Sequence, residues 1–134
     1  MIIVDASIAL KWVVPEAGSD RARHLLASEV LAAPGLMWVE CANVLWVKVR
    51  RGQISREAAT AAMVAIDSAP VRAIAARDLA RAAQTIAFEL DQTAYDCLYL
   101  AAALAERAVL VTADEAFARA AEAHPVYGSS VRGL

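Results

Sequence analysis

The chain has 134 residues, the size of one ordinary domain, and no linker or repeat divides it. Its 60% hydrophobic content excludes an intrinsically disordered protein. A formal net charge of −2 excludes a protein that holds nucleic acid through a global positive field. Any work on RNA would therefore depend on a local site within a single domain over residues 1–134.

The sequence predicts a cytoplasmic protein that does not contact a membrane. Its first residues lack the basic segment and long apolar run of a signal peptide. The longest uncharged stretch, residues 30–39, is far shorter than the about 20 apolar residues of a membrane span. Cys41 and Cys97 have no metal-type spacing, so we expect two buried thiols in a reducing compartment.

Short apolar runs typical of buried strands alternate with helical patterns along the chain. In the first half we expect a strand at 1–5, a helix at 8–14 capped by Ser7, a helix from Ser19 or Asp20 to 29, a short strand at 30–33 and a long helix at 36–51 that Gly52 ends. The β-branched and Trp residues of 36–51 would also suit a strand, but the length of the segment favours a helix.

In the second half we expect helices at 55–67, at 78–90 with Asp78 as its cap, at 93–107 and at 114–123, strands at 71–74 and 109–112, and a last edge strand at 126–127. This alternation implies right-handed crossovers and a mainly parallel sheet between two helical layers, an α/β three-layer sandwich. Ligands of such sheets bind beyond the carboxyl ends of the strands.

Two aspartates follow predicted buried strands and should lie at that edge. Asp5 ends the first strand, with Ser7 two residues later, and Asp114 follows Thr112 at the end of the 109–112 strand. A hydroxyl beside each carboxylate can orient it, as neighbouring groups do for metal ligands. For Asp114 alone, a simple helix N-cap is an equal alternative.

Glu40 lies in a segment that is apolar nearly all round, which predicts a buried helix. A buried carboxylate is costly unless it is paired or binds a cation. Asn43, three residues along on the same face, can hold Glu40 in place, and the segment has no base before Lys48. The alternative is an ion pair with a distant arginine.

Asp96 falls in the first turn of a strongly apolar helix. Thr93 and Asp96 have the spacing of a capping box, so helix initiation is one interpretation. The other is a carboxylate that points from the helix N-terminus into a cleft shared with the other three acids. Two carboxylates about 5 Å apart repel by roughly 3 kcal/mol at an effective dielectric of about 20. Such a cleft needs raised pKa values or cations, and an all-carboxylate site suits Mg²⁺ or Mn²⁺.

Four segments in this order resemble the four motifs of PIN-domain nucleases, and more closely those of VapC-type toxins of toxin–antitoxin pairs. They are Val4-Asp5-Ala6-Ser7, Glu40-Cys41-Ala42-Asn43-Val44-Leu45, Tyr95-Asp96-Cys97-Leu98-Tyr99-Leu100-Ala101-Ala102-Ala103 and Leu110-Val111-Thr112-Ala113-Asp114-Glu115-Ala116-Phe117. Each motif is weak alone, but the ordered set is specific. Residues 55–90 match only in general character, so no RNA target is carried over.

The resemblance implies a PIN-like sandwich, a homodimer, and a Mg²⁺- or Mn²⁺-dependent endoribonuclease with a cognate antitoxin that covers the acidic cleft. It assigns Asp5, Glu40, Asp96 and Asp114 as catalytic metal ligands, and Ser7, Asn43 and Thr112 as supporting residues. Metal-activated water would then leave 5′-phosphate and 3′-hydroxyl ends. Cyclic phosphate ends would instead require an acid and a base such as His24 and His124, both expected at the surface.

Candidates for RNA contact are Lys11, Lys48, Arg50 and Arg51, although a solvated face or a snorkelling helix end explains them equally well. Trp12, Trp38 and Trp46 could stack bases, but the helical spacing of the last two favours packing in the core or a dimer.

Two other enzyme classes fit poorly. A receiver domain would place a lysine after a late strand, and none follows Lys48; an aspartyl phosphatase would have an acid where Ser7 stands. A PIN-like module that binds RNA or a partner without cutting, and a housekeeping RNA-processing nuclease, remain as alternatives.

Overall fold

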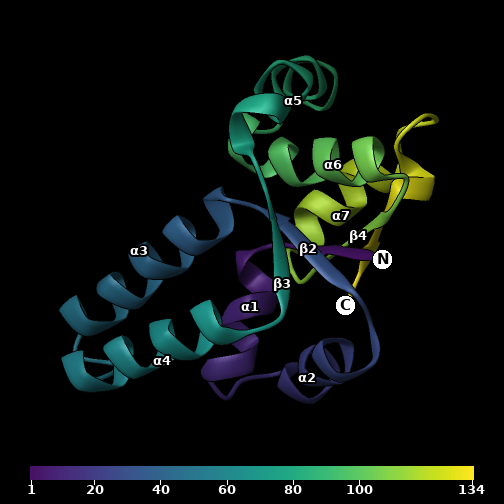
Figure 1. The fold of residues 1–134 in the computed structure, drawn as a ribbon. Helices are drawn as coiled ribbons and strands as arrows, with labels where there is room; N and C mark the ends of the chain where they lie inside the picture. The colour runs from purple at the N-terminus through teal and green to yellow at the C-terminus, as the bar shows by residue number, and fades with distance from the viewer.

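A computed structural model, which describes residues 1–134, shows a five-stranded sheet at the centre of the molecule (Figure 1). The strands are β1 (Ile2–Val4), β2 (Leu31–Pro34), β3 (Val71–Ile74), β4 (Val109–Thr112) and β5 (Val131–Gly133). They lie in the order β3-β2-β1-β4-β5, and every neighbouring pair is parallel. The predicted parallel sheet is confirmed. β1 lies at its centre and is buried throughout, which explains its unbroken apolar sequence.

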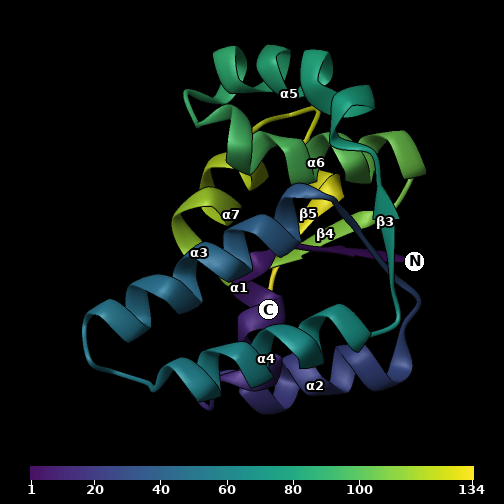
Figure 2. The ribbon, with the colours of Figure 1, turned by 60° about the vertical axis from the view of Figure 1, so that its left-hand side comes forward.

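Seven α-helices cover the two faces of the sheet (Figure 2). They are α1 (Ala6–Val13), α2 (Ser19–Ser28), α3 (Leu36–Arg50), α4 (Arg56–Ser68), α5 (Ala76–Leu90), α6 (Ala94–Glu106) and α7 (Glu115–Glu122). On one face of the sheet α6 packs on β1, β2 and β4. On the same face α5 packs against the outer side of α6, and α7 lies beside β5. Helices α1, α2 and α4 lie on the opposite face. The predicted three-layer α/β/α sandwich is therefore confirmed.

The core is one cluster of buried side chains around β1 and α6. Ile3 and Val4 of β1 are fully buried, as is Leu100 near the middle of α6. The run Ala101 to Ala103 is also buried, and its short side chains let α6 approach the sheet closely.

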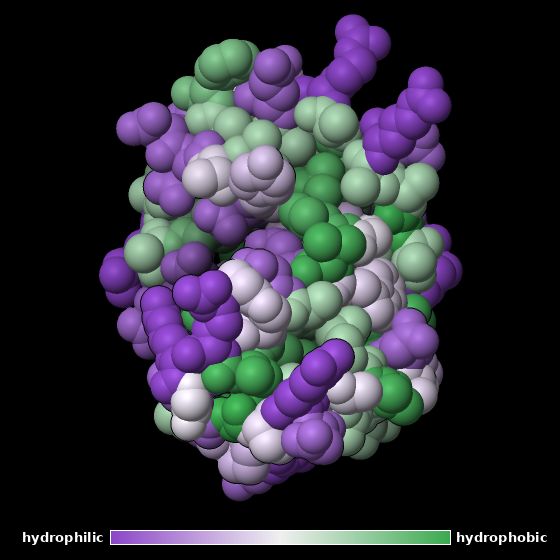
Figure 3. Space-filling view, turned by 90° about the vertical axis from the view of Figure 1, so that its left-hand side faces the viewer, coloured by the Kyte–Doolittle hydropathy of each residue, from purple (hydrophilic) through white to green (hydrophobic).

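Helix α3 is less buried than its sequence predicts. Only Met37, Cys41 and Leu45 are buried along it, while Val39 and Trp46 are 65% and 55% exposed. The helix pairs with α4 and projects from the sheet, so it has solvent on its outer side (Figure 1). Figure 3, which faces that side, shows apolar side chains in a band between charged ones. The prediction of a helix buried all round is wrong, because α3 packs along one stripe only.

Two helices begin earlier than predicted. Asp5, not Ser7, is the N-cap of α1, since its carboxylate accepts a hydrogen bond from the backbone N–H of Ile8. Helix α5 begins at Ala76 after the non-polar N-cap Ala75, so Asp78 lies in its first turn instead of capping it. For α1 the sequence offered two polar residues near the start, and propensity alone chose the wrong one. The start of α5 carries no polar cap, so no capping signal could locate it. The predicted stop at Gly52 is confirmed by its left-handed φ of 70°.

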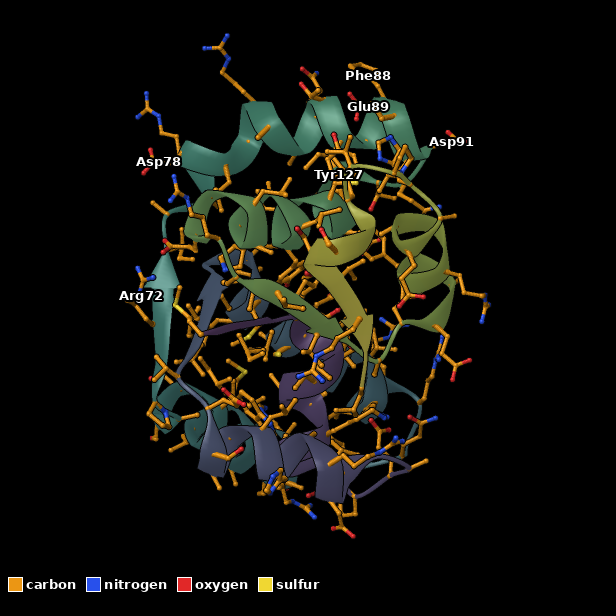
Figure 4. The ribbon with its side chains drawn as sticks, turned by 90° about the vertical axis from the view of Figure 1, so that its right-hand side faces the viewer. Arg72, Asp78, Phe88, Glu89, Asp91 and Tyr127 are labelled. Carbon is orange, nitrogen blue, oxygen red and sulfur yellow. The ribbon has the colours of Figure 1, made fainter.

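The last strand lies at Val131–Gly133 and not at 126–127. Val126 is 65% exposed, whereas the buried Tyr127 donates its hydroxyl to Glu89 of α5 and stacks on His124 at a ring distance of 4.4 Å. Figure 4 shows Tyr127 directed toward Glu89 beneath α5. This anchor turns the chain before it reaches the sheet, so β5 forms five residues later. The same stacking leaves His124 half-buried instead of at the surface.

None of the helices is long and apolar enough to span a bilayer. Cys41 and Cys97 are buried and free, as predicted. Burial, the largest cause, raises the pKa of Cys41 to about 12 and that of Cys97 to about 11, and neighbouring acids add to both shifts. These thiols are therefore unreactive packing residues.

The position of Leu100 in the core gives a test of the packing on α6. Leu100→Ala should lower the free energy of unfolding by about 2–5 kcal/mol, because its side chain is fully buried between the helix and the sheet. Leu104→Ala, four residues along the same helix but 36% exposed, is the matched control and should cost less than about 1 kcal/mol. Urea unfolding measures both, and equal losses would contradict the packing described.

Candidate active site

The strand order places a switch point between β1 and β4. The chain crosses from β1 toward β2 and β3 on one side, and returns to β4 and β5 on the other. Asp5 follows β1 and Asp114 follows β4, two adjacent parallel strands whose carboxyl ends share one edge. The crevice that opens at such a point is the usual ligand site of an open α/β sheet.

Asp5 is held by hydroxyl groups from helix α1 and from strand β4. Ser7 donates a hydrogen bond to Oδ1 of Asp5 at 2.5 Å, and Thr112 donates one to Oδ2. The same hydroxyls accept from the chain after β4: Ser7 Oγ from the N–H of Ala113 at 2.9 Å, and Thr112 Oγ1 from that of Asp114 at 3.0 Å. Ser7 and Thr112 therefore lie where the sequence predicted, and they fix the ends of β1 and β4 together.

Glu40 is held by Tyr99, a residue that the sequence analysis missed. The hydroxyl of Tyr99, which is only 3% exposed, donates to Oε1 of Glu40. Asn43 is exposed and makes no hydrogen bond to Glu40, so the predicted support from Asn43 is wrong. A signal was available: Tyr99 lies three residues after Asp96, on the same face of its helix.

Helix N-termini surround the remaining acids. Asp114 caps α7 by accepting from the N–H of Phe117 at 3.0 Å, and Thr93 caps α6, which puts Asp96 in the first turn. Helix capping by Asp114 and helix initiation around Asp96, the structural alternatives, are thus both observed, but they do not exclude a second role in the cleft. Together with Asp5 on α1, three helices begin around one place, and the positive ends of their dipoles partly offset the acids.

The four predicted acids line a single cleft of about 220 Å³. Its walls are Asp5, Glu40, Asp96 and Asp114, with Ala6, Ser7, Leu10, Val44 and Tyr99. The carboxylates are spread around the walls, and no three acid, His or Cys side chains are grouped tightly enough to hold one ion as they stand.

The negative charge of this cleft has no partner. Every ion pair in the structure involves other acids, so the alternative of an arginine paired with Glu40 is wrong. Burial, first, and then nearby acids raise the pKa of Glu40 and of Asp96, while hydrogen bonds from Tyr99 and Thr93 oppose the rise. The pKa of Asp5 is raised chiefly by burial, against the hydrogen bonds that it accepts. An added divalent cation would reverse these costs.

The predicted RNA-contact residues lie outside the cleft. Lys11 is engaged with Glu16 at 3.1 Å and the carbonyl of Ala17 at 2.7 Å. Lys48, Arg50 and Arg51 lie at the far end of the α3–α4 pair, where Arg50 covers the ring of Trp46 at 5.2 Å.

Of the other aromatic candidates, Trp12 is buried and donates to the carbonyl of Ala22, which excludes base stacking, and Trp38 packs against the core. His24 is exposed, as predicted, and neither it nor His124 lines the cleft.

Comparisons with known proteins agree with this geometry. The sequence model of the PIN domain matches residues 2–123. Among solved structures, PAE2754 from Pyrobaculum aerophilum is similar with 25% identity and a TM-score of 0.72, covering 89% of this chain and 78% of that one. VapC20 of Mycobacterium tuberculosis, a toxin that cleaves the sarcin–ricin loop, has 23% identity and a TM-score of 0.69, covering 90% and 95%.

VapBC2 from Rickettsia felis, solved with a promoter DNA fragment, has 15% identity and a TM-score of 0.65, covering 99% and 98%. A search of curated protein sequences gave no significant match. At these identities the last two structures show a shared fold.

The unpaired charge predicts that Asp96→Asn stabilises the metal-free protein at neutral pH, by about 1 kcal/mol. A carboxyl with a raised pKa favours folding below its ordinary pKa, and this contribution is lost as the pH rises through the raised value. The difference in free energy of unfolding between Asp96→Asn and wild type should therefore vanish in acid.

Asp78→Asn is the matched control, because Asp78 also lies in the first turn of a helix but points away from the cleft into solvent (Figure 4). Thermal unfolding in chelator at several pH values measures both variants. A destabilised Asp96→Asn protein at neutral pH would show that the charge of Asp96 is already compensated.

Proposed function

Since the chain belongs to the PIN-domain family, we propose that it is a divalent-metal-dependent endoribonuclease that hydrolyses RNA to 5′-phosphate and 3′-hydroxyl ends. The observation that supports this function most is the convergence of four carboxylates on one cleft that no basic side chain lines. Asp5, Glu40, Asp96 and Asp114 come from four separate parts of the chain, and folding alone gains nothing from gathering their charge.

The donor set fits Mg²⁺ or Mn²⁺. All four side chains offer hard oxygen ligands, and no thiol or imidazole lines the cleft. When bound, such an ion supplies an activated water and stabilises charge on the phosphate. The four acids would hold it, and their spread around the cleft leaves room for water and a phosphodiester between them.

The remaining residues keep these ligands in position. Ser7 and Thr112 restrain both oxygens of Asp5, and Tyr99 restrains one oxygen of Glu40. Glu40 and Asp96, whose pKa values are raised and whose carboxylates accept fewer hydrogen bonds than that of Asp5, are the better candidates to accept the proton of the attacking water. No histidine is available for that step in the cleft, which favours hydrolysis over the formation of cyclic phosphate.

We further propose that the nuclease is the toxin of a toxin–antitoxin pair acting in the cytoplasm. The structural likeness to VapC20 and to the VapBC2 complex supports this role. The chemistry of the cleft suits inhibition by an antitoxin whose basic side chain enters between the carboxylates and occupies the place of the cation.

A homodimer would cover an apolar groove next to the cleft. This groove of about 490 Å³ lies between α3, α5 and α6 and is lined by Leu36, Val39, Ala80, Tyr95 and Leu98 among others. Val39 and Tyr95 are 65% and 67% exposed, and they are the direct neighbours of Glu40 and Asp96. Pairing of two copies here would bury these side chains and bring two acidic clefts together.

Cleavage of RNA tests the proposed function directly. We expect Mn²⁺ or Mg²⁺ to support cleavage of single-stranded RNA and chelator to abolish it. Asp5→Asn and Asp96→Asn should each lower the rate by about a hundredfold or more, because each removes a ligand charge. Asp78→Asn is the control and should cut at the wild-type rate. End mapping should give 5′-phosphates; equal rates in all variants, or cyclic phosphate ends, would refute the proposal.

The dimer gives a separate prediction. Ala80→Glu should increase the monomer fraction in sedimentation experiments, since it places a charge in the apolar groove. Ala82→Glu, on an exposed part of α5 outside the groove, should leave the assembly unchanged. A wild-type protein that is monomeric, or two variants with the same effect, would contradict this interface.

A further inference from the structure

A further pocket lies away from both the acidic cleft and the apolar groove, against α2. It occupies about 350 Å³ between α2 and the ends of β4 and β5, the region where β5 runs down toward α2 in Figure 4. Leu25 and Val111 give it an apolar floor. Arg21, His24 and Arg132 are the basic residues among its other lining residues. The volume falls in the range of about 300–1,000 Å³ that is typical of ligand sites. We refer to it as the Arg21–Arg132 pocket.

The two arginines of this pocket have no acidic partner. Neither Arg21 nor Arg132 takes part in an ion pair. The one acidic side chain that lines the pocket, Asp20, already pairs with Arg23 at 3.6 Å. Two guanidinium groups without counter-charge favour an anion, and their planar donor pattern matches phosphate oxygens.

The pocket is connected to the acidic cleft along the protein surface. A smaller hollow of about 290 Å³ shares Arg21 and Gly133 with the pocket and extends to Thr112 and Ala113. Thr112 donates to Asp5, and the N–H of Ala113 bonds to Ser7, so this hollow ends at the wall of the cleft. An RNA strand held through cations at the four acids would therefore have a path to the two arginines.

We propose that the Arg21–Arg132 pocket binds one nucleotide of the RNA substrate, with the hollow of about 290 Å³ between it and the cleavage site, an inference that rests on the proposed function. The base would lie on the apolar floor of Leu25 and Val111, and the arginines would bind its phosphate. Single-stranded RNA is recognised in this way, by packing of splayed bases and charged contacts to the backbone. The pocket thus supplies the positive charge that the acidic cleft itself lacks.

Arg21→Gln and Arg132→Gln test the pocket, with Arg81→Gln on α5 as the charge-matched control. Both pocket residues and the control are exposed and unpaired, so all three variants should fold. Fluorescence anisotropy with a single-stranded 12-nucleotide RNA, in chelator and at low salt, measures binding without cleavage. Each pocket variant should raise Kd by about fivefold to tenfold and reduce the salt slope by about 1, whereas the control should bind as wild type.

Cleavage in Mn²⁺ then separates the pocket from the proposed function. The pocket variants should lower kcat/KM for the 12-nucleotide RNA but not for a dinucleotide, which is too short to reach the pocket. Absence of cleavage by wild type would refute the nuclease while leaving the binding result to decide on the pocket. Pocket variants that bind the 12-nucleotide RNA like the control would overturn the inference. So would a loss of affinity confined to free 5′-AMP, which would indicate a mononucleotide site.

Discussion

Asp5 is a partly buried carboxylate whose charge is met by hydroxyl groups and not by a basic side chain. Burial opposes its ionisation, and the hydrogen bonds from Ser7 and Thr112 work against that penalty. The same two hydroxyls also accept from the backbone that follows β4. One small network therefore orients the Asp5 carboxylate and locks the two central strands at their carboxyl ends, and the positions of Asp114 and of helix α7 follow from it.

Two other acids of the cleft also lie at the start of a helix, so the residues that build the cleft also stabilise helices. Asp5 and Asp114 each cap a helix while facing the cleft, and Thr93 caps the helix that carries Asp96. A cap stabilises a helix by about 1 kcal/mol, which offsets part of the repulsion that gathering the charges creates. The fold thus tolerates an uncompensated negative site because the residues that build it also begin its helices. Competing structural explanations for single residues, such as an N-cap, do not exclude a functional site.

The sequence predicted what depends on local pattern and on strand ends. Apolar runs such as Ile2–Val4 and Val109–Thr112 identify central strands, and parallel pairing then brings Asp5 and Asp114 to one edge. The sequence-based predictions failed where a contact between distant residues determines the structure. Tyr99 reaches Glu40 across 59 positions, and Tyr127 anchors to Glu89, which delays the last strand to Val131. The exposure of α3 was missed because an apolar sequence does not say whether its outer face meets the core, solvent or another protein.

Under the proposed function, the distribution of charge explains how a protein of net charge −2 would act on a polyanion. Metal-free, the acidic cleft repels phosphate, so the strand has to be held elsewhere until cations neutralise the carboxylates. The unpaired arginines lie away from the acids, along a hollow that leads to them, and not among them, where they would form ion pairs and displace the metal. Because this hollow separates the arginines from the acids, neither set of charges neutralises the other. The proposed RNA substrate with its metal ions would satisfy them together, since its phosphates would pair with the arginines at one end and bridge to cations at the other.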